Sequence, residues 1–198
     1  FALSADEMRA LLDGLVTDTP LAIRGKAILE LAYSSALRPR EVRALKVSDI
    51  DYQKGLLFIE QSKNRKDRLV PVGSVALKWV TEYLQTVRPR LIHGLTHPVV
   101  FVAHDTGGPL SPEGMRWVVR ETFRKSGIDP VPLSAMRACA ASNLLDAGMG
   151  LVHIARLLGH VDVNTTVHYL SVRERELGDV LENAHERIRE RYTKEGET

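Results

Sequence analysis

The stretch LLGHVDVNTTVHYL (157–170) decides how the chain is organised. An apolar helical pattern ends at Gly159, and His160 follows immediately. A Thr-Thr pair then leads into a second helical stretch, and Tyr169 lies nine residues after His160. A tyrosine in a helix is normally a core or surface residue. At a fixed distance from a histidine at a helix end, it is also a candidate nucleophile, and the rest of the chain decides between the two.

Helical periodicity dominates the sequence around this stretch. Ser4 and Glu7 form a capping box that starts the first helix, and Leu3, Met8, Leu11, Leu12 and Leu15 make one apolar stripe. Further helices are expected over residues 20–35, 39–45, 74–87, 112–125, 134–148 and 151–158, with a long polar helix over 173–192.

The helical period is interrupted once by strand-like sequence. LLFIEQ (56–61) and RLVPV (68–72) read as two antiparallel strands joined by a basic turn, and VVFVA (99–103) as a short strand or a buried segment. The predicted fold class is therefore mainly α with a small antiparallel β-sheet. Trp79 and Trp117 sit at helical spacing, and we expect both in the core.

Composition indicates a globular chain in a reducing compartment. Of 198 residues, 44% are hydrophobic and 26% charged, and no apolar run reaches the roughly 20 residues that a membrane span needs. No signal peptide is recognisable, and the single cysteine, Cys139, excludes an internal disulfide. We expect a cytoplasmic, nucleoid-associated protein. Because the chain opens on Phe1, we also expect it to be a fragment of a longer protein.

Basic residues cluster in one place although the net charge is only +2. QSKNRKDRLV (61–70) has four basic residues and one acid. Such a patch is weak evidence for a polyanionic partner, and a solvated hairpin tip explains it equally well.

Four separated segments carry the candidate chemistry. They are ALRPREVRAL (36–45), SKNRKDRLVP (62–71), PLSAMR (132–137) and the opening stretch. In their order and spacing these pieces resemble the catalytic domain of the tyrosine recombinases, or phage integrases: A-L-R-x-x-E, K-x-R-x-V-P, x-x-R, L-L-G-H and T-T-x-x-Y. The resemblance covers residue 3 to about residue 175. It implies the DNA breaking–rejoining fold, no cofactor and no metal.

The resemblance assigns roles to the phosphate-binding residues. Arg38 and Arg137 would hold the non-bridging oxygens of the scissile phosphate, and His160 would donate to it. Two guanidiniums suit this task, because they form bidentate, charge-assisted hydrogen bonds where negative charge develops. An ordinary salt bridge from Glu41 to Arg38 or Arg40 is the structural alternative.

The resemblance also supplies a nucleophile and a general acid. Tyr169 would attack phosphorus and form a 3′-phosphotyrosine, which conserves the bond so that rejoining needs no ATP. Lys63, at the hairpin tip, would protonate the leaving 5′-oxygen, with Lys66 as the alternative. We expect Arg40, Arg65, Lys66 and Arg68 to contact DNA.

Position 134 departs from the family pattern. Members of the family that the chain resembles usually carry histidine three residues before the second arginine, whereas this chain has Ser134. Histidine can accept the tyrosine proton near neutral pH, but serine is a negligible base. Ser134 is also a good N-cap, so it could simply start its helix. In either case the tyrosine lacks its usual proton acceptor, so we expect the site to be active but slower.

The implied protein is a site-specific DNA recombinase acting on double-stranded DNA. We expect a catalytic domain over residues 1–175, and a helical tail over 176–198 whose apolar stripe contacts a neighbouring subunit in a homotetramer on DNA. We expect the family's N-terminal core-binding domain to be absent from this chain. A type IB topoisomerase and a catalytically impaired DNA-binding relative are the two alternatives.

Overall fold

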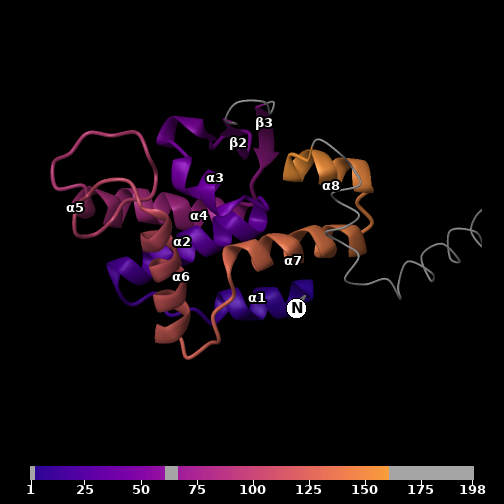
Figure 1. Ribbon diagram of the computed structural model, residues 1–198, viewed down its shortest axis with the longest axis horizontal. Helices are drawn as coiled ribbons and strands as arrows, with labels where there is room; N and C mark the ends of the chain where they lie inside the picture. The colour runs from indigo at the N-terminus through magenta and orange to yellow at the C-terminus, as the bar shows by residue number, and fades with distance from the viewer. Residues whose placement is uncertain (1–2, 61–66, 161–198) are drawn as a thin grey trace, which may run out of the picture.

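The computed structural model describes residues 3–60 and 67–160. Its elements follow in the order α1 (Ala5–Asp13), α2 (Pro20–Ser34), α3 (Pro39–Ala44), η1 (Val47–Asp49), β1 (Ile50–Asp51), β2 (Leu56–Ile59), β3 (Arg68–Pro71), α4 (Ser74–Glu82), η2 (Tyr83–Val87), α5 (Arg88–Leu91), α6 (Pro112–Lys125), α7 (Leu133–Asp146) and α8 (Leu151–Leu158). The predicted class, mainly α with a small antiparallel sheet, is confirmed (Figure 1).

Side-chain caps set the starts of three helices. Ser4 accepts a hydrogen bond from the backbone of Glu7, whose carboxylate accepts in return from the backbone N–H of Ser4. Thr19 and Ser111 cap α2 and α6 by accepting from the backbone N–H groups of Ala22 and Gly114, without a reciprocal side-chain bond, and each is followed by proline as the first helical residue. These caps satisfy N–H groups that have no partner within the helix, so the chain has a local reason to begin each helix there.

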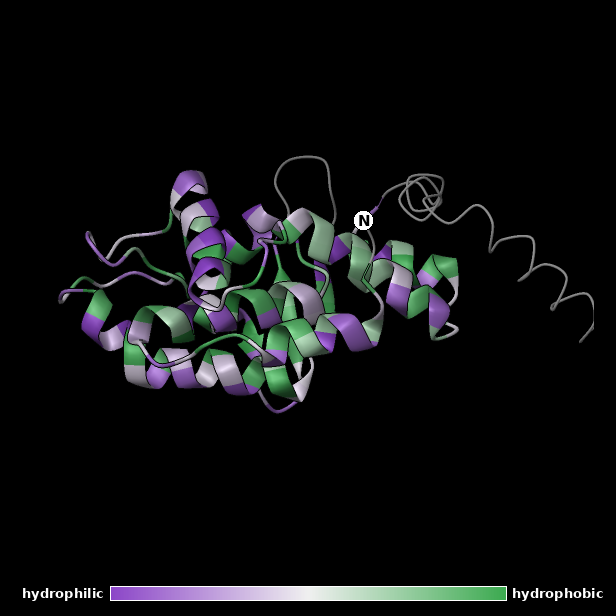
Figure 2. Cartoon of the chain, turned by 90° about the horizontal axis from the view of Figure 1, so that it is seen from below, coloured by the Kyte–Doolittle hydropathy of each residue, from purple (hydrophilic) through white to green (hydrophobic). Residues whose placement is uncertain are grey.

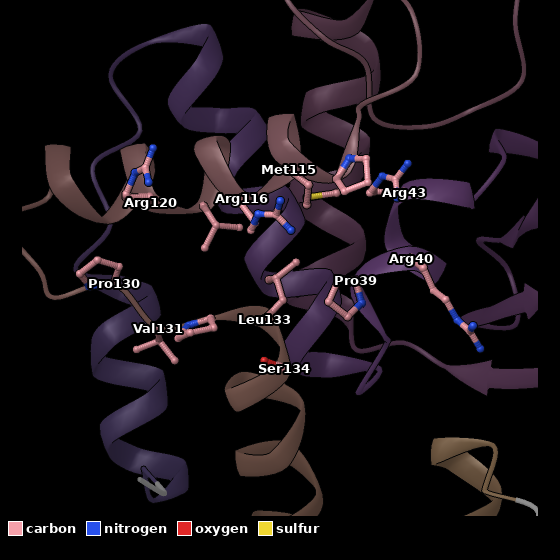
Figure 3. A pocket seen from close by; sticks show the side chains of 13 residues that line it. Pro39, Arg40, Arg43, Met115, Arg116, Arg120, Pro130, Val131, Leu133 and Ser134 are labelled. Atoms are coloured by element: carbon pink, nitrogen blue, oxygen red, sulfur yellow. The ribbon is translucent and has the colours of Figure 1, made fainter.

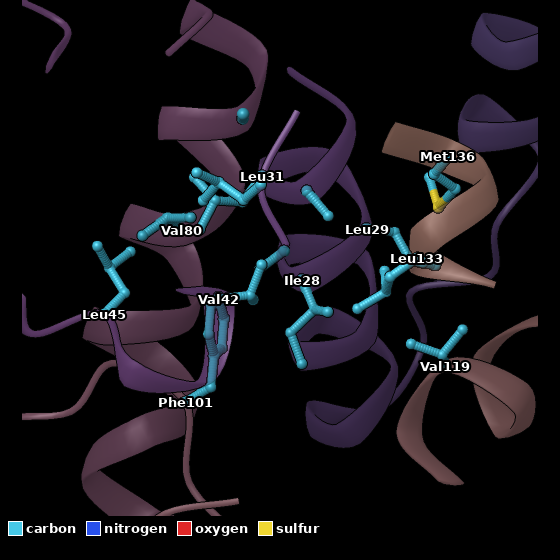
Figure 4. Packing of buried hydrophobic residues seen from close by; sticks show 14 of the residues in the cluster. Ile28, Leu29, Leu31, Val42, Leu45, Val80, Phe101, Val119, Leu133 and Met136 are labelled. Atoms are coloured by element: carbon cyan, nitrogen blue, oxygen red, sulfur yellow. The ribbon is translucent and has the colours of Figure 1, made fainter. Parts of the chain in front are cut away.

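Helix α2 runs through the middle of the fold and contacts α4, α6 and α7 (Figure 1). Its residues from Gly25 to Ala32 are all buried, and Ile28, Leu29 and Leu31 pack between the neighbouring helices (Figure 4). A Cβ at Gly25 would lie only 1.9 Å from the Thr122 hydroxyl oxygen on α6. Glycine is therefore what allows α2 and α6 to approach this closely.

Helices α1, α3, α4, α6 and α7 contact α2. The helices carry both hydrophilic and hydrophobic residues (Figure 2). Trp79 is partly buried against this core, but Trp117 is 40% exposed and stacks on His104, so its predicted core position was wrong. None of the helices within 3–60 and 67–160 is long and apolar enough to cross a bilayer.

The sheet has three antiparallel strands in the order β1-β2-β3, one more than predicted. Its register pairs Leu57 with Val70 and Ile59 with Arg68. Leu57, Ile59 and Val70 are buried, so one face of the sheet packs on the helices. Residues 99–103 form a buried segment with isolated bridges instead of a strand.

Helix α8 packs on α7 through a small apolar cluster that includes Ala140, Ile154 and Leu158. It ends at Gly159, whose φ of 62° lies in the left-handed region that glycine adopts easily. This turn leads to His160, where the described part of the chain ends.

Candidate active site

The buried carboxylate of Glu41, on α3, lies at the centre of the site. Arg68 donates to both of its oxygens, from Nη1 to Oε1 at 3.1 Å and from Nη2 to Oε2 at 2.9 Å. Arg38 supplies two more donors, Nη1 to Oε1 and its backbone N–H to Oε2, both at 2.9 Å. Each oxygen therefore accepts two hydrogen bonds, which is the full capacity of a carboxylate.

These partners keep Glu41 ionised. Burial alone would raise its pKa, but hydrogen bonds from Arg68 and from the Arg38 backbone, with the charge of Arg68, hold the pKa below its ordinary value of 4.5. Arg137 adds a third guanidinium, 3.9 Å from Oε2. One negative charge thus lies among three positive ones.

The same three arginines, here called the arginine trio, also take up the end of α8. Each of three successive carbonyls accepts from a different member: Leu157 from Arg68 Nε at 3.0 Å, Leu158 from Arg137 Nη2 at 2.7 Å, and Gly159 from Arg38 Nη2 at 3.2 Å. The carbonyls at a helix C-terminus have no partner within the helix and carry its negative dipole end. The trio supplies hydrogen-bond donors to these carbonyls and positive charge beside the negative end of the dipole.

Arg137 is fixed from a second side by the turn that follows α2. Its Nη1 donates to the Ala36 carbonyl, and the residue is only 2% exposed. Ala36 itself is held at φ 46°, in the left-handed region, which costs an L residue roughly 1–2 kcal/mol. The turn thus places Arg38, two residues later, beside Arg137.

His160 completes the group. Its Nε2 lies 3.4 Å from Arg137 Nη2, and its backbone N–H donates to the Ala155 carbonyl, closing the end of α8. Three residues predicted from separate segments, Arg38, Arg137 and His160, therefore lie together. Two guanidiniums beside an imidazole can bind a phosphoryl group and stabilise the extra charge of its pentavalent transition state.

Ser134 lies one helical turn before Arg137, but it does not cap its helix as expected. Helix α7 begins one residue earlier, at Leu133, with Pro132 at the N-cap position and no side-chain cap. Arg137 is accordingly in the second turn of α7. Ser134 is exposed, so its hydroxyl is accessible at the surface.

Arg68 does not have the position that the sequence predicted. As a DNA contact it would point outward, but its side chain is only 10% exposed and its hydrogen bonds run to Glu41 and Leu157. Alternation along β3 explains this, because Arg68 shares the face of the buried Val70. The alternation in RLVPV already indicates an inward-facing Arg68, but the basic residues of the preceding turn favoured a DNA contact.

A pocket of about 480 Å³ opens beside Ser134, between α3, α6 and the start of α7 (Figure 3). Its apolar wall includes Met115, Val119, Val131 and Leu133. Four arginines also line it: Arg40, Arg43, Arg116 and Arg120. Arg40 was a predicted DNA contact and is exposed here; Arg116 and Arg120 were missed, although their spacing of four residues places them on one face of α6.

The remaining predicted residues lie outside the described part of the chain. They are Lys63, Arg65, Lys66 and Tyr169, together with the whole tail from residue 176 onward. Their proposed roles stay predictions.

Comparison with known proteins identifies the family. The model of the phage integrase family matches residues 2–176. "Tyrosine recombinase XerC 2" of Ralstonia nicotianae is 36% identical over 92% of this chain and 52% of its own length. "Tyrosine recombinase XerD" of Halalkalibacterium halodurans is 34% identical over 94% of this chain and 62% of its own length. The chain thus spans about half to three fifths of these curated relatives.

Solved structures give the same fold. The crystal structure of XerA recombinase matches with a TM-score of 0.75 and 26% identity, over 90% of this chain and 63% of the other. XerH site-specific recombinase bound to its difH substrate matches with a TM-score of 0.71 at 18% identity, over 91% of this chain and 53% of the other. These matches identify the fold as that of the tyrosine recombinase catalytic domain. The chain belongs to the phage integrase family.

Proposed function

We propose that this chain is the catalytic part of a site-specific DNA recombinase, which cuts and rejoins strands through a phosphotyrosine intermediate. The observation that carries the proposal is the meeting of Arg38, Arg137 and His160 at the end of α8. Family membership supports the same chemistry.

In the proposed reaction, Tyr169 is the nucleophile: its phenol gives its proton to water while the phenol oxygen attacks phosphorus. A new P–O bond forms as the bond from phosphorus to the 5′-oxygen breaks, and the leaving oxygen takes a proton from Lys63, or alternatively from Lys66. Arg38 and Arg137 stabilise the charge that develops on the non-bridging oxygens. Rejoining is the reverse reaction, so the number of phosphodiester bonds is conserved, and neither ATP nor a metal is required.

Double-stranded DNA is the proposed partner. XerH in the matched structure is described as bound to its difH substrate. On this chain, the exposed arginines of the pocket, Arg40, Arg116 and Arg120, supply positive charge beside Ser134. We assign them contacts with the DNA backbone. Assembly into a homotetramer through the tail and a cytoplasmic, nucleoid-associated location complete the proposal.

The test is trapping of the covalent intermediate. The full chain is incubated with a pool of nicked duplexes of randomised core sequence, in which the short leaving fragment diffuses away and blocks rejoining. Denaturing gels then reveal protein–DNA adducts, and sequencing of the trapped DNA gives the site. The unaltered chain should form adducts, whereas Tyr169→Phe should bind DNA without forming any.

Tyr52→Phe is the matched control, because Tyr52 is an exposed tyrosine on the turn after β1. It should form adducts at the normal rate. Adducts that persist in Tyr169→Phe would remove the nucleophile assignment. DNA binding without any adduct by the unaltered chain would favour a silent binder, and relaxation of supercoils without exchange between two sites would favour a topoisomerase.

A further inference from the structure

Arg68 is the one member of the arginine trio to which the proposed chemistry gives no task. It is the first residue of β3, and its guanidinium reaches α3 through Glu41 and α8 through the Leu157 carbonyl. These partners are 27 and 89 positions away in the sequence. One side chain therefore ties together three elements that the chain brings in from different places.

Stability alone explains this arrangement poorly. Removing an ion pair from water costs about as much as the pair gains, and apolar residues at such positions often give an equally stable protein. The fork of two parallel N–H bonds instead supplies direction, because it fixes the plane of the carboxylate that it binds.

That plane determines where Arg38 lies. With Arg68 on one side of the carboxylate, Oε1 and Oε2 each keep one acceptor position for Arg38, and its Nη1 and backbone N–H fill them. The backbone contact also closes the first turn of α3. Rotation of Glu41 would displace both the guanidinium and the helix start.

The third hydrogen bond of Arg68 acts on α8. From Nε it holds the carbonyl of Leu157, in the last turn of the helix. Gly159 and His160 follow directly, and the imidazole lies 3.4 Å from Arg137. The position of this last turn therefore sets the distance between His160 and the guanidinium beside it.

We propose that Arg68 is a positioning residue for the phosphate-binding groups: it orients Arg38 through Glu41 and His160 through the end of α8, without itself touching DNA. The proposal rests on the proposed function, since it concerns groups that act on the scissile phosphate.

Arg68→Lys tests it with two versions of the trapped duplex, one with the natural phosphate at the cleaved position and one with a methylphosphonate. The methylphosphonate has a methyl group in place of one non-bridging oxygen and carries no negative charge, so its cleavage depends less on well-placed cations. Lysine keeps the charge opposite Glu41 but cannot form the fork together with a third bond. The single-turnover rate should fall about 100-fold on the phosphate and far less on the methylphosphonate.

Arg88→Lys is the matched control. Arg88 also donates to several backbone carbonyls, those of His97, Val99 and Val100, but within the described residues it makes no hydrogen bond to the trio or to Glu41. Any loss that it causes should be equal on the two substrates. Each single-turnover rate is divided by the fraction of protein molecules that can form adducts, so that unfolded molecules do not lower the value.

Arg68→Gln takes the place of the lysine variant if that variant does not fold. An equal loss on both substrates, or no loss on either, would overturn the positioning role. If instead the unaltered chain forms no adduct, the proposed function itself fails, so the two failures are distinguishable.

Discussion

Replacing Glu41 with glutamine should destabilise the fold more than any exposed charge change. Glutamine has the same shape, but only one of its two terminal atoms can accept hydrogen bonds. Of the four donors around the carboxylate, two from Arg68 and two from Arg38, two would face an NH₂ group, and the trio would lose the negative charge of Glu41. Breaking a buried pair on one side costs about 3–5 kcal/mol.

We expect the lower end of that range, about 3 kcal/mol, because the Arg38 side chain is 17% exposed and water can replace part of what it loses. Urea denaturation followed by circular dichroism measures the effect. With a slope of about 2 kcal/mol per M for a chain of this size, the midpoint should fall by about 1.5 M.

The pH dependence provides an independent check. The pKa of Glu41 is lowered by folding, so its contribution is fully present above the ordinary value of 4.5 and is lost as the pH falls through the lower folded value. The difference between the unaltered chain and Glu41→Gln should therefore be constant near neutral pH and shrink below pH 4.5. Glu121→Gln is the control, because Glu121 pairs with Arg124 at the surface of α6. An equal midpoint shift for both variants, or a Glu41 effect that does not diminish in acid, would refute the reasoning.

Three further outcomes are expected. Ser134→His should speed single-turnover cleavage and flatten its pH profile between about pH 6 and 9, because imidazole can accept the Tyr169 proton; an unchanged or slower reaction contradicts the missing-base account. Gly25→Ala should lower the free energy of unfolding by about 1–3 kcal/mol in urea titrations, since its Cβ would overlap Thr122, and adding Thr122→Ala should recover part of the loss. Arg120→Ala should weaken DNA binding at all sequences and reduce the slope of log K against log salt by about 1 in fluorescence anisotropy, and an unchanged slope would exclude a phosphate contact.

Local signals made most of the helices predictable. Ser4, Thr19 and Ser111 each satisfy helix N–H groups within three residues of themselves, so the sequence alone contains the whole interaction. Helix α7 shows the limit of such reasoning. It starts after Pro132, which offers no side-chain cap, and the better capping residue, Ser134, lies inside the helix. Strand β1 has only two residues and therefore no alternation to detect.

The residues of the site were predictable singly, but their connections were not. The sequence offered Glu41 a pair with Arg38, which is confirmed. Its second partner, Arg68, comes from a strand, and the carbonyls that the trio binds come from α8. Such contacts depend on how α3, β3 and α8 are placed in space, which no short window of sequence encodes. The pocket depends in the same way on three helices.

The hydrogen bonds from the arginine trio to α8 constrain how these positions can drift in evolution. At an exposed site, arginine and lysine exchange freely, because both supply only a charge. Within the trio, each guanidinium binds a backbone carbonyl while it also faces Glu41, which an ammonium group cannot reproduce. A library varied at one of these positions, and selected only for folded protein, should therefore return arginine even where no DNA is ever cut. When these positions are varied together with Glu41, they should accept apolar residues. Such variants should fold but should not cleave DNA.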